Sequence, residues 1–221
     1  MLKRLLPLIL LPWLLPACGA PAARATPQVI SVYASSAAYP WLDEIYTCAS
    51  STVIVRLSDP VAADISLRWG EPAPLSTAAY QVGSDDLLVI VQRQTAVGSL
   101  TLNQVRQIFS GQITQWQAVG GGNIAVQVWT YAPAEDIQQV FDEFVMQGEP
   151  IVSLARLATS VQSMSDSVGA TPGAIGVLPR RWKAGNTNAV LDVTSVPVLA
   201  IPAAPPQGAA RGLLSCLQSK E

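Results

Sequence analysis

The chain has 221 residues, with 13 basic and 15 acidic side chains, no histidine and a formal net charge of −2 at pH 7. This near balance, with no basic cluster longer than residues 180–183, excludes the electrostatic footprint of a nucleic-acid-binding protein. The lack of histidine, of a zinc-type cluster, of a nucleophile elbow and of a Walker loop argues against an enzyme and predicts no metal and no cofactor, although catalysis by Asp/Glu or Ser/Lys pairs stays open.

The N-terminal segment is typical of an export signal. Lys3 and Arg4 precede an apolar run over residues 5–15, which is shorter than the roughly 20 residues that span a bilayer and is interrupted by prolines. The run leads into Leu-Pro-Ala-Cys-Gly, and the residues on either side of Cys18 resemble the lipobox of bacterial lipoproteins. We therefore expect residues 1–17 to be a lipoprotein signal peptide and Cys18 to carry the lipid.

That processing would leave residues 18–27 as a tether of small residues and prolines, which cannot bury much apolar area. The protein would then be extracytoplasmic and lipid-anchored to the bacterial cell membrane. The alternative is an ordinary signal peptide that happens to hold a cysteine.

Two further cysteines, Cys48 and Cys216, lie near the two ends of the exported part. Export places them where disulfides persist, so we expect a bond between them that staples the ends of the chain together. The alternative is two buried free thiols.

The first half of the chain alternates strand and helix patterns. The short apolar runs at residues 29–33, 53–57, 63–67 and 87–91 predict strands, the last of them preceded by Asp85 and Asp86. Between the first two runs, a small-residue loop leads into a helix that carries Trp41, Leu42 and Ile45 at helical spacing. Runs that are apolar throughout suit a sheet covered on both faces.

The second half repeats the alternation. Thr101 and Gln104 form a capping box for a helix that Gly111 ends. Further expected elements are a strand at 124–130, a helix opened by Pro133, a turn and strand over 171–178, a strand at 196–201 and a last helix at 209–217. We expect the strand at 196–201 to lie at a sheet edge because it contains Pro197. The whole pattern predicts an α/β fold.

Residues 100–116 read LTLNQVRQIFSGQITQW, and residues 171–178 read TPGAIGVL. Both segments resemble the phosphate-type substrate-binding proteins of ABC importers, which contain a PBP domain, and a weaker likeness extends elsewhere between residues 29 and 178. The resemblance implies a two-lobed, type 2 periplasmic-binding-protein fold, in which small mixed sheets are flanked by helices and a ligand cleft lies between the lobes. It places residues 28–92 and 180–221 in lobe 1 and residues 93–179 in lobe 2.

The resemblance also implies where a ligand would be held. Such proteins bind phosphate through a Ser/Thr-rich loop after the first strand, through a carboxylate after the third strand, and through a loop of the Arg-x-x-Gly-Ser-Gly-Thr type. The positions of this chain that match the first two elements are Ser35, Ser36, Asp64 and Ser66.

The third element is altered in this chain. Tyr131 stands at the arginine position, and Glu135, Asp136 and Ile137 replace Ser, Gly and Thr. Two carboxylates at a helix start repel an anion, so phosphate is disfavoured as the ligand. The alternative interpretation of the two acidic residues is that they cap the helix on an exposed turn. Arg68 has two interpretations as well: it supplies compensating charge from the other lobe, or it is a partly exposed residue at a strand end.

Aromatic side chains near these positions have two interpretations as well. Tyr131, Trp129 and Trp69 either line an aromatic cleft or belong to the core, as aromatic residues in a small sheet more often do.

Two functions remain from the sequence. One is a solute-binding protein that delivers a small, non-phosphate molecule to an ABC permease. The other is a non-transport member with a degenerate site, which acts as an envelope sensor or docks with another protein. Both predict a cleft between two lobes, and the sequence itself does not choose between them.

Overall fold

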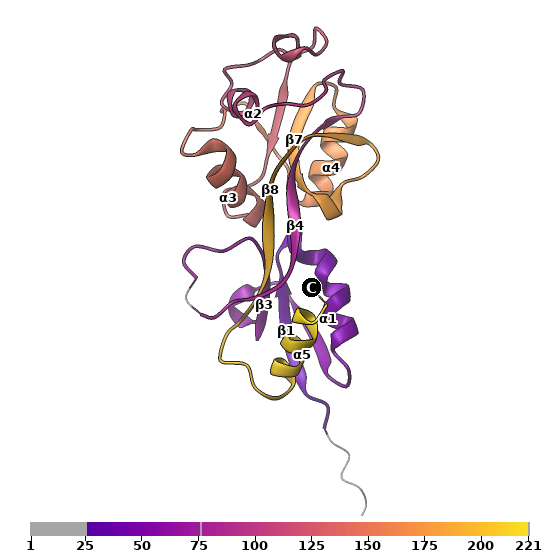
Figure 1. Ribbon diagram of the computed structural model, residues 1–221, viewed down its shortest axis with the longest axis vertical. Coiled ribbons are helices and arrows are strands. Elements are labelled where there is room, and N and C mark those ends of the chain that lie inside the picture. Colours follow the sequence, from indigo (N-terminus) through magenta and orange to yellow (C-terminus); the bar gives the residue numbers. More distant parts are fainter. Residues whose placement is uncertain (1–25, 76, 221) are drawn as a thin grey trace, which may run out of the picture.

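Two long strands, β4 (Tyr80–Gln92) and β8 (Thr187–Pro202), run side by side through the middle of the molecule and connect its two halves (Figure 1). The computed structural model describes residues 26–75 and 77–220. The expected signal peptide, Cys18 and the tether up to residue 25 lie outside the described residues.

The described strands form one mixed sheet in the order β2-β1-β3-β8-β4-β7-β5-β6. β1 pairs in parallel with β2 and β3, β8 is antiparallel to β3 and β4, and β7 is antiparallel to β4 but parallel to β5, which in turn pairs in parallel with β6. The remaining strands are β1 (Val29–Ala34), β2 (Val53–Leu57), β3 (Ile65–Trp69), β5 (Gln127–Thr130), β6 (Arg156–Leu157) and β7 (Ala174–Pro179).

Helices cover the sheet in both halves. α1 and α5 lie in the half that contains β1 to β3, whereas α2, α3 and α4 lie in the half that contains β5 to β7 (Figure 1). Their bounds are Leu42–Cys48 for α1, Leu102–Phe109 for α2, Asp136–Phe141 for α3, Val161–Ala170 for α4 and Gly208–Gln218 for α5. The α/β fold with helix-flanked strands is therefore confirmed. The described residues contain no helix that is both long and apolar enough to cross a membrane.

The centre of β4 is the most deeply buried part of the sheet. Residues 87–91 are fully buried because β7 and β8 flank the strand and helices cover it, which matches their unbroken apolar sequence. Away from it, Trp41 and Ile45 fill the core of one half, and Phe109 packs against Phe141 in the other with ring centroids 4.5 Å apart.

Local signals predicted several boundaries. The Thr101 and Gln104 capping box is present at the start of α2, and Gly111, just beyond its end, has a φ of +80°. α5 covers the predicted last helix, and β2 has the predicted bounds.

The strands predicted at 63–67 and 196–201 begin at Ile65 and Thr187 instead. Three further predictions of boundary or position were wrong. β4 begins at Tyr80, so Asp85 and Asp86 lie inside the strand; Asp85 is tolerated there because it accepts hydrogen bonds from the backbone N–H groups of Asp86 and Arg181. α3 begins at Asp136 instead of at Pro133, after a turn, and continues into a π-helical segment over Asp142–Met146.

The third is Pro197, which does not mark an edge strand because β8 lies between β3 and β4. Its carbonyl accepts from the Gly70 N–H at 2.8 Å, one residue past the end of β3. In an antiparallel pair, the N–H and the C=O of one residue point to the same neighbouring strand. The N–H that a residue other than proline would have at position 197 would therefore point past the end of β3, so its absence removes no hydrogen bond between β3 and β8.

The predicted disulfide is present between Cys48 at the end of α1 and Cys216 in α5. It joins the first and last helices of the fold across a sequence separation of 168 residues. Closing so long a loop removes much of the conformational freedom of the unfolded chain.

We expect a Cys48→Ser/Cys216→Ser variant to unfold at a lower urea concentration, with a loss of up to about 5 kcal/mol in the loop-entropy model. Reductant should destabilise the unmodified protein and leave the variant unchanged. Equal stability of the oxidised protein and the variant would contradict this prediction.

Candidate functional site

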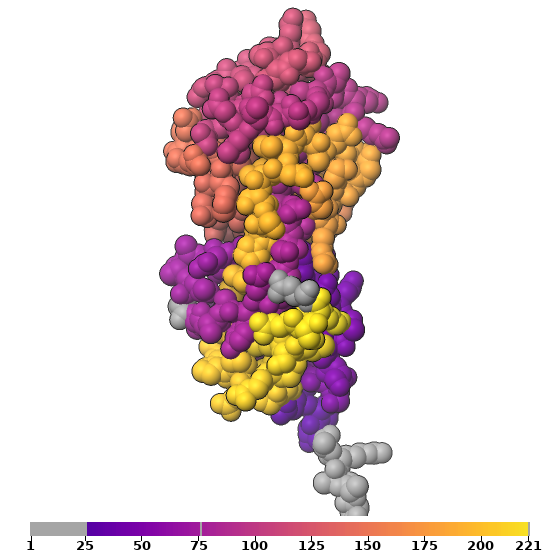
Figure 2. All heavy atoms as spheres, in the orientation of Figure 1, coloured from indigo at the N-terminus to yellow at the C-terminus, as the bar shows by residue number. Residues whose placement is uncertain are grey.

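The functional candidates of both halves meet where β1 and β3 end and α3 begins. We call the five side chains at this point the bridging cluster: Tyr33, Ser36, Arg68, Glu135 and Asp136. The first three belong to the half with β1 to β3, and the two carboxylates come from the other half. The cluster therefore joins the two halves of the molecule, which narrows between them (Figure 2).

Arg68 and Asp136 form the central contact. The Arg68 Nε donates to Asp136 Oδ1 at 3.0 Å and to Oδ2 at 3.1 Å, and its Nη2 also donates to Oδ1. The Trp69 backbone N–H donates to Asp136 Oδ2 at 3.0 Å. The Asp136 side chain is only 5% exposed and the Arg68 side chain 21%, so the carboxylate depends on these donors in place of water.

A second contact runs parallel to the first. The Ser36 hydroxyl donates to Glu135 Oε2 at 2.8 Å, again from one half to the other. Neither Glu135 nor any other side chain caps the start of α3. The expectation that Glu135 and Asp136 cap an exposed turn is therefore wrong, because both carboxylates are held by donors from the opposite half.

The charges of the cluster influence one another. Hydrogen bonding to Asp136 raises the pKa of the Arg68 guanidinium. Burial raises the pKa of the Tyr33 phenol; Arg68 opposes that rise, whereas Asp136 and Glu135 add to it. Tyr33 is thus a neutral member that faces all three charges.

The donors of the cluster are of the kind that binds oxyanions. A guanidinium, a backbone N–H and a hydroxyl converge from one half, and in this structure they bind two carboxylates of the same chain. The arrangement can hold the two halves together without a ligand. Asp136 accepts from the Arg68 Nε and Nη2 groups and Glu135 accepts from Ser36, so an external anion would have to displace the two carboxylates to use these donors.

The other sequence-predicted site residues lie elsewhere. Ser35 is next to the cluster but is buried, and its hydroxyl has no hydrogen-bond partner within the described part of the chain. Asp64 precedes β3 and accepts from Ser31, and Ser66 donates to Pro60, so neither is brought to the cluster. The phenol of Tyr131 donates to the Val177 carbonyl in the core, and burial raises its pKa well above the usual value.

Sequence reasoning missed two members of the cluster. Tyr33 was read only as part of a strand, and Asp136 was not singled out as a candidate site residue. The alternation of β1 already placed Tyr33 two residues before the serine loop, which is the signal that pointed to it. No comparable signal joined Asp136 to Arg68, since the two are 68 residues apart.

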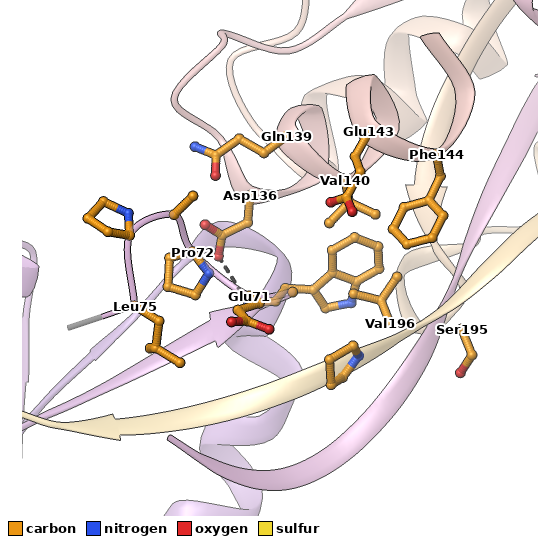
Figure 3. Close-up of a pocket in the computed structure, with 15 residues that line it drawn as sticks. Glu71, Pro72, Leu75, Asp136, Gln139, Val140, Glu143, Phe144, Ser195 and Val196 are labelled. Atoms are coloured by element: carbon orange, nitrogen blue, oxygen red, sulfur yellow. Dashed lines mark hydrogen bonds between the residues drawn. The ribbon is translucent and has the colours of Figure 1, made fainter. Parts of the chain in front are cut away.

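A cavity of about 420 Å³ lies directly beside the cluster (Figure 3). Its lining comes from the end of β3 and the following loop, from α3 and the π-helical segment, and from β8. Trp69 and Asp136 belong to both the cavity and the contacts described above. Gly70 has a φ of +89°, and a Cβ there would lie 2.7 Å from Val140 Cγ2, so glycine is required for the close approach of the two halves.

The family model of the PBP superfamily domain matches residues 74–210. The chain belongs to the PBP superfamily. The matched region contains β4 and β8 and the elements between them, which form the long connection and the half that supplies Glu135 and Asp136.

Solved structures show how widely the fold of this PBP-superfamily protein is shared. A phosphate ABC transporter substrate-binding protein from Clostridium perfringens, described as putative and with bound phosphate, is 16% identical with a TM-score of 0.75, covering 86% of this chain and 93% of that one. An ABC-type phosphate transport receptor from Vibrio cholerae is 19% identical with a TM-score of 0.67, covering 86% and 94%.

A third structure is the regulatory domain of a variant of OxyR2 from Vibrio vulnificus, at 9% identity and a TM-score of 0.63, covering 88% and 98%. The fold is therefore similar both to transport receptors and to a regulatory domain. At these identities the likeness establishes the fold alone.

Removing the two partners of the central contact should have unequal effects. Arg68→Met leaves a buried carboxylate without its cation and should cost about 3 kcal/mol of unfolding free energy. Asp136→Asn keeps an acceptor for Trp69 and leaves an arginine that still reaches water, so it should cost about 1–2 kcal/mol. The double variant should cost less than the sum, as measured by urea denaturation.

Arg180→Met is the matched control, because this arginine pairs with the exposed Asp86 and Asp192 and its loss should change stability little. Strictly additive costs for Arg68→Met and Asp136→Asn would show that the two side chains do not stabilise one another.

Proposed function

We propose that this PBP-superfamily protein is a lipid-anchored, extracytoplasmic solute-binding protein of an ABC-type importer, not an enzyme, and that its interlobe cleft takes a small solute other than phosphate. The proposed lobes are residues 28–92 with 180–221, and residues 93–179. The fold shared with two phosphate transport receptors supports the class. The observation that carries the exclusion of phosphate is that Glu135 and Asp136 already occupy Ser36, Arg68 and the Trp69 N–H.

The exclusion follows from the free energy of exchange. A phosphate that entered the cluster would gain the Arg68 Nε and Nη2 donors and the Ser36 hydroxyl only after these had released their carboxylates. Asp136 would then remain with little access to water, beside a second anion. Like charges at about 4 Å repel by about 4 kcal/mol at an effective dielectric constant near 20. A repulsion of this size weakens the binding of phosphate by roughly a thousandfold.

The cavity beside the cluster supports the presence of a solute site. It lies between the two halves, as solute sites of two-lobed proteins do, and its size is in the range of small-molecule pockets. In the proposed mechanism, solute in this cavity contacts both lobes and holds them closed for presentation to the permease.

A second candidate function is an envelope sensor or protein-docking module. One specific observation favours it: two contacts within the chain, Arg68–Asp136 and Ser36–Glu135, join the halves. Contacts of this kind suit a partner that recognises the two joined halves. The shared fold of the Vibrio vulnificus regulatory domain is compatible with this candidate.

Thermal unfolding of the chain from residue 19 onward, measured with phosphate, sulfate, molybdate, organic acids, amino acids, cations and sugars, tests the proposal. A solute at about 100 times its dissociation constant should stabilise the protein by roughly 2.7 kcal/mol. Phosphate should have no effect. The absence of any thermal stabilisation across the entire panel would favour the docking function.

Removal of both carboxylates should open the cluster to an anion. We expect a Glu135→Ala/Asp136→Ala variant to bind phosphate or sulfate through Arg68 and Ser36, with calorimetry detecting binding in the variant and none in the unmodified protein. Adding Arg68→Met to the variant should abolish the gain. Tight phosphate binding by the unmodified protein would contradict the exclusion.

Lipid anchoring has its own test. Cys18→Ala should move the protein from the membrane fraction to the soluble extracytoplasmic fraction, because the lipid has no other attachment point. A variant that remains in the membrane fraction would contradict anchoring through Cys18 without affecting the proposed solute site.

A further inference from the structure

The cavity beside the bridging cluster has a negative lining. Glu71, in the loop after β3, and Glu143, in the π-helical segment after α3, both line it and come from opposite halves (Figure 3). Among the described residues neither carboxylate has a hydrogen-bond or ion-pair partner, unlike Asp136, whose charge Arg68 balances. Of the residues that the structure describes, no lysine or arginine belongs to the lining.

The rest of the lining is largely apolar. Trp69 and Phe144 provide aromatic surface, and Leu75, Val140 and Val196 provide aliphatic surface together with three prolines. Such walls favour a ligand with an apolar body, and aromatic faces attract a positive charge. Trp69 is fully buried, and its indole N–H has no hydrogen-bond partner among the described residues.

Other ligand classes fit these features less well. An anion would be repelled by Glu71 and Glu143, which no lining cation balances. A hard metal ion needs about six oxygen ligands, and the part of the chain described here has no group of three His, Cys, Asp or Glu residues placed to hold a metal. A neutral sugar would leave both carboxylates without a charged partner.

Resting on the proposed solute-binding function, we propose that this cavity binds a small organic ammonium ion with an apolar body. Glu71 and Glu143 attract the ammonium charge, and the apolar body contacts Phe144 and the aliphatic side chains of the lining. Because the two carboxylates belong to opposite halves, the cation adds an attraction across the cleft alongside the Arg68–Asp136 contact.

The experiment compares choline with 3,3-dimethylbutan-1-ol, in which a carbon replaces the charged nitrogen at the same shape. Calorimetry on the purified mature protein should detect choline, and the neutral alcohol should bind at least about tenfold more weakly. Glu143→Gln and Glu71→Gln should each weaken choline binding by about tenfold at physiological salt.

Glu149→Gln is the matched control, since Glu149 is an exposed carboxylate of the same half that does not line the cavity. It should leave choline binding unchanged. An equal loss in Glu149→Gln and Glu143→Gln would overturn the site assignment, and equal binding of the two probes would overturn the role of the charge.

Failure of this inference is distinguishable from failure of the proposed function. If choline, tetramethylammonium and putrescine all fail to bind at about 1 mM while a neutral or zwitterionic solute of the wider panel stabilises the protein, the ammonium site is wrong and solute binding stands. If no solute of any class binds, both are overturned.

Discussion

The ion pair between Arg68 and Asp136 is the constraint on which the arrangement of this protein depends. It is the point where the half built on β1 to β3 meets the half that carries α3, and its carboxylate is almost completely removed from water. A charge in that position is tolerated only when donors surround it, and the Arg68 guanidinium and the Trp69 N–H provide them. The two halves therefore have a preferred relation to each other before any ligand is considered.

The scaffold around this pair explains why it affects the whole molecule. β4 and β8 are the long elements common to both halves, so a bend in this two-stranded ribbon changes the separation of the halves while each keeps its own packing. The disulfide between α1 and α5 holds the end of the chain in the half with β1 to β3. The bridging cluster and the cavity lie next to the ribbon, so such a bend would change the distances between the residues that the two halves contribute to them.

Under the proposed function, the carboxylates of Glu135 and Asp136 take up donors that could otherwise bind an external anion. This arrangement has two consequences for recognition. The anion-binding donors become part of the internal structure, and the remaining unbalanced charge in the cleft is the negative charge of Glu71 and Glu143. A fold shared with phosphate receptors can in this way bind a ligand of the opposite charge, or be recognised by a partner protein that contacts the two joined halves.

Local features of this fold were predictable from the sequence, and contacts between distant segments were not. The capping box of Thr101 and Gln104 and the strand at Val53–Leu57 depend on neighbouring residues, so their patterns predicted them correctly. Pro197 was misplaced because the effect of a missing N–H depends on where the neighbouring strand ends, which the pattern of β8 alone does not contain.

The site shows the same division. The altered loop at Glu135 was recognised from the sequence, and so was the idea that Arg68 supplies charge from the other lobe. The pairing of Arg68 with Asp136 required the fold, and so did the separation of Asp64 and Tyr131 from the cluster. Asp64 was matched to a carboxylate after the third strand, but β3 begins only at Ile65, so Asp64 lies at the opposite end of the strand from Arg68.

The most direct test of the central claim is the distance between the two halves in the absence of ligand. Spin labels at Gln117→Cys and Arg211→Cys, two exposed positions in opposite halves, would report it by pulsed electron paramagnetic resonance. The account predicts one narrow distance distribution for the ligand-free protein, and a longer, broader one after Glu135→Gln and Asp136→Asn are introduced. A ligand-free protein that is already broad, and that the two substitutions leave unchanged, would contradict it.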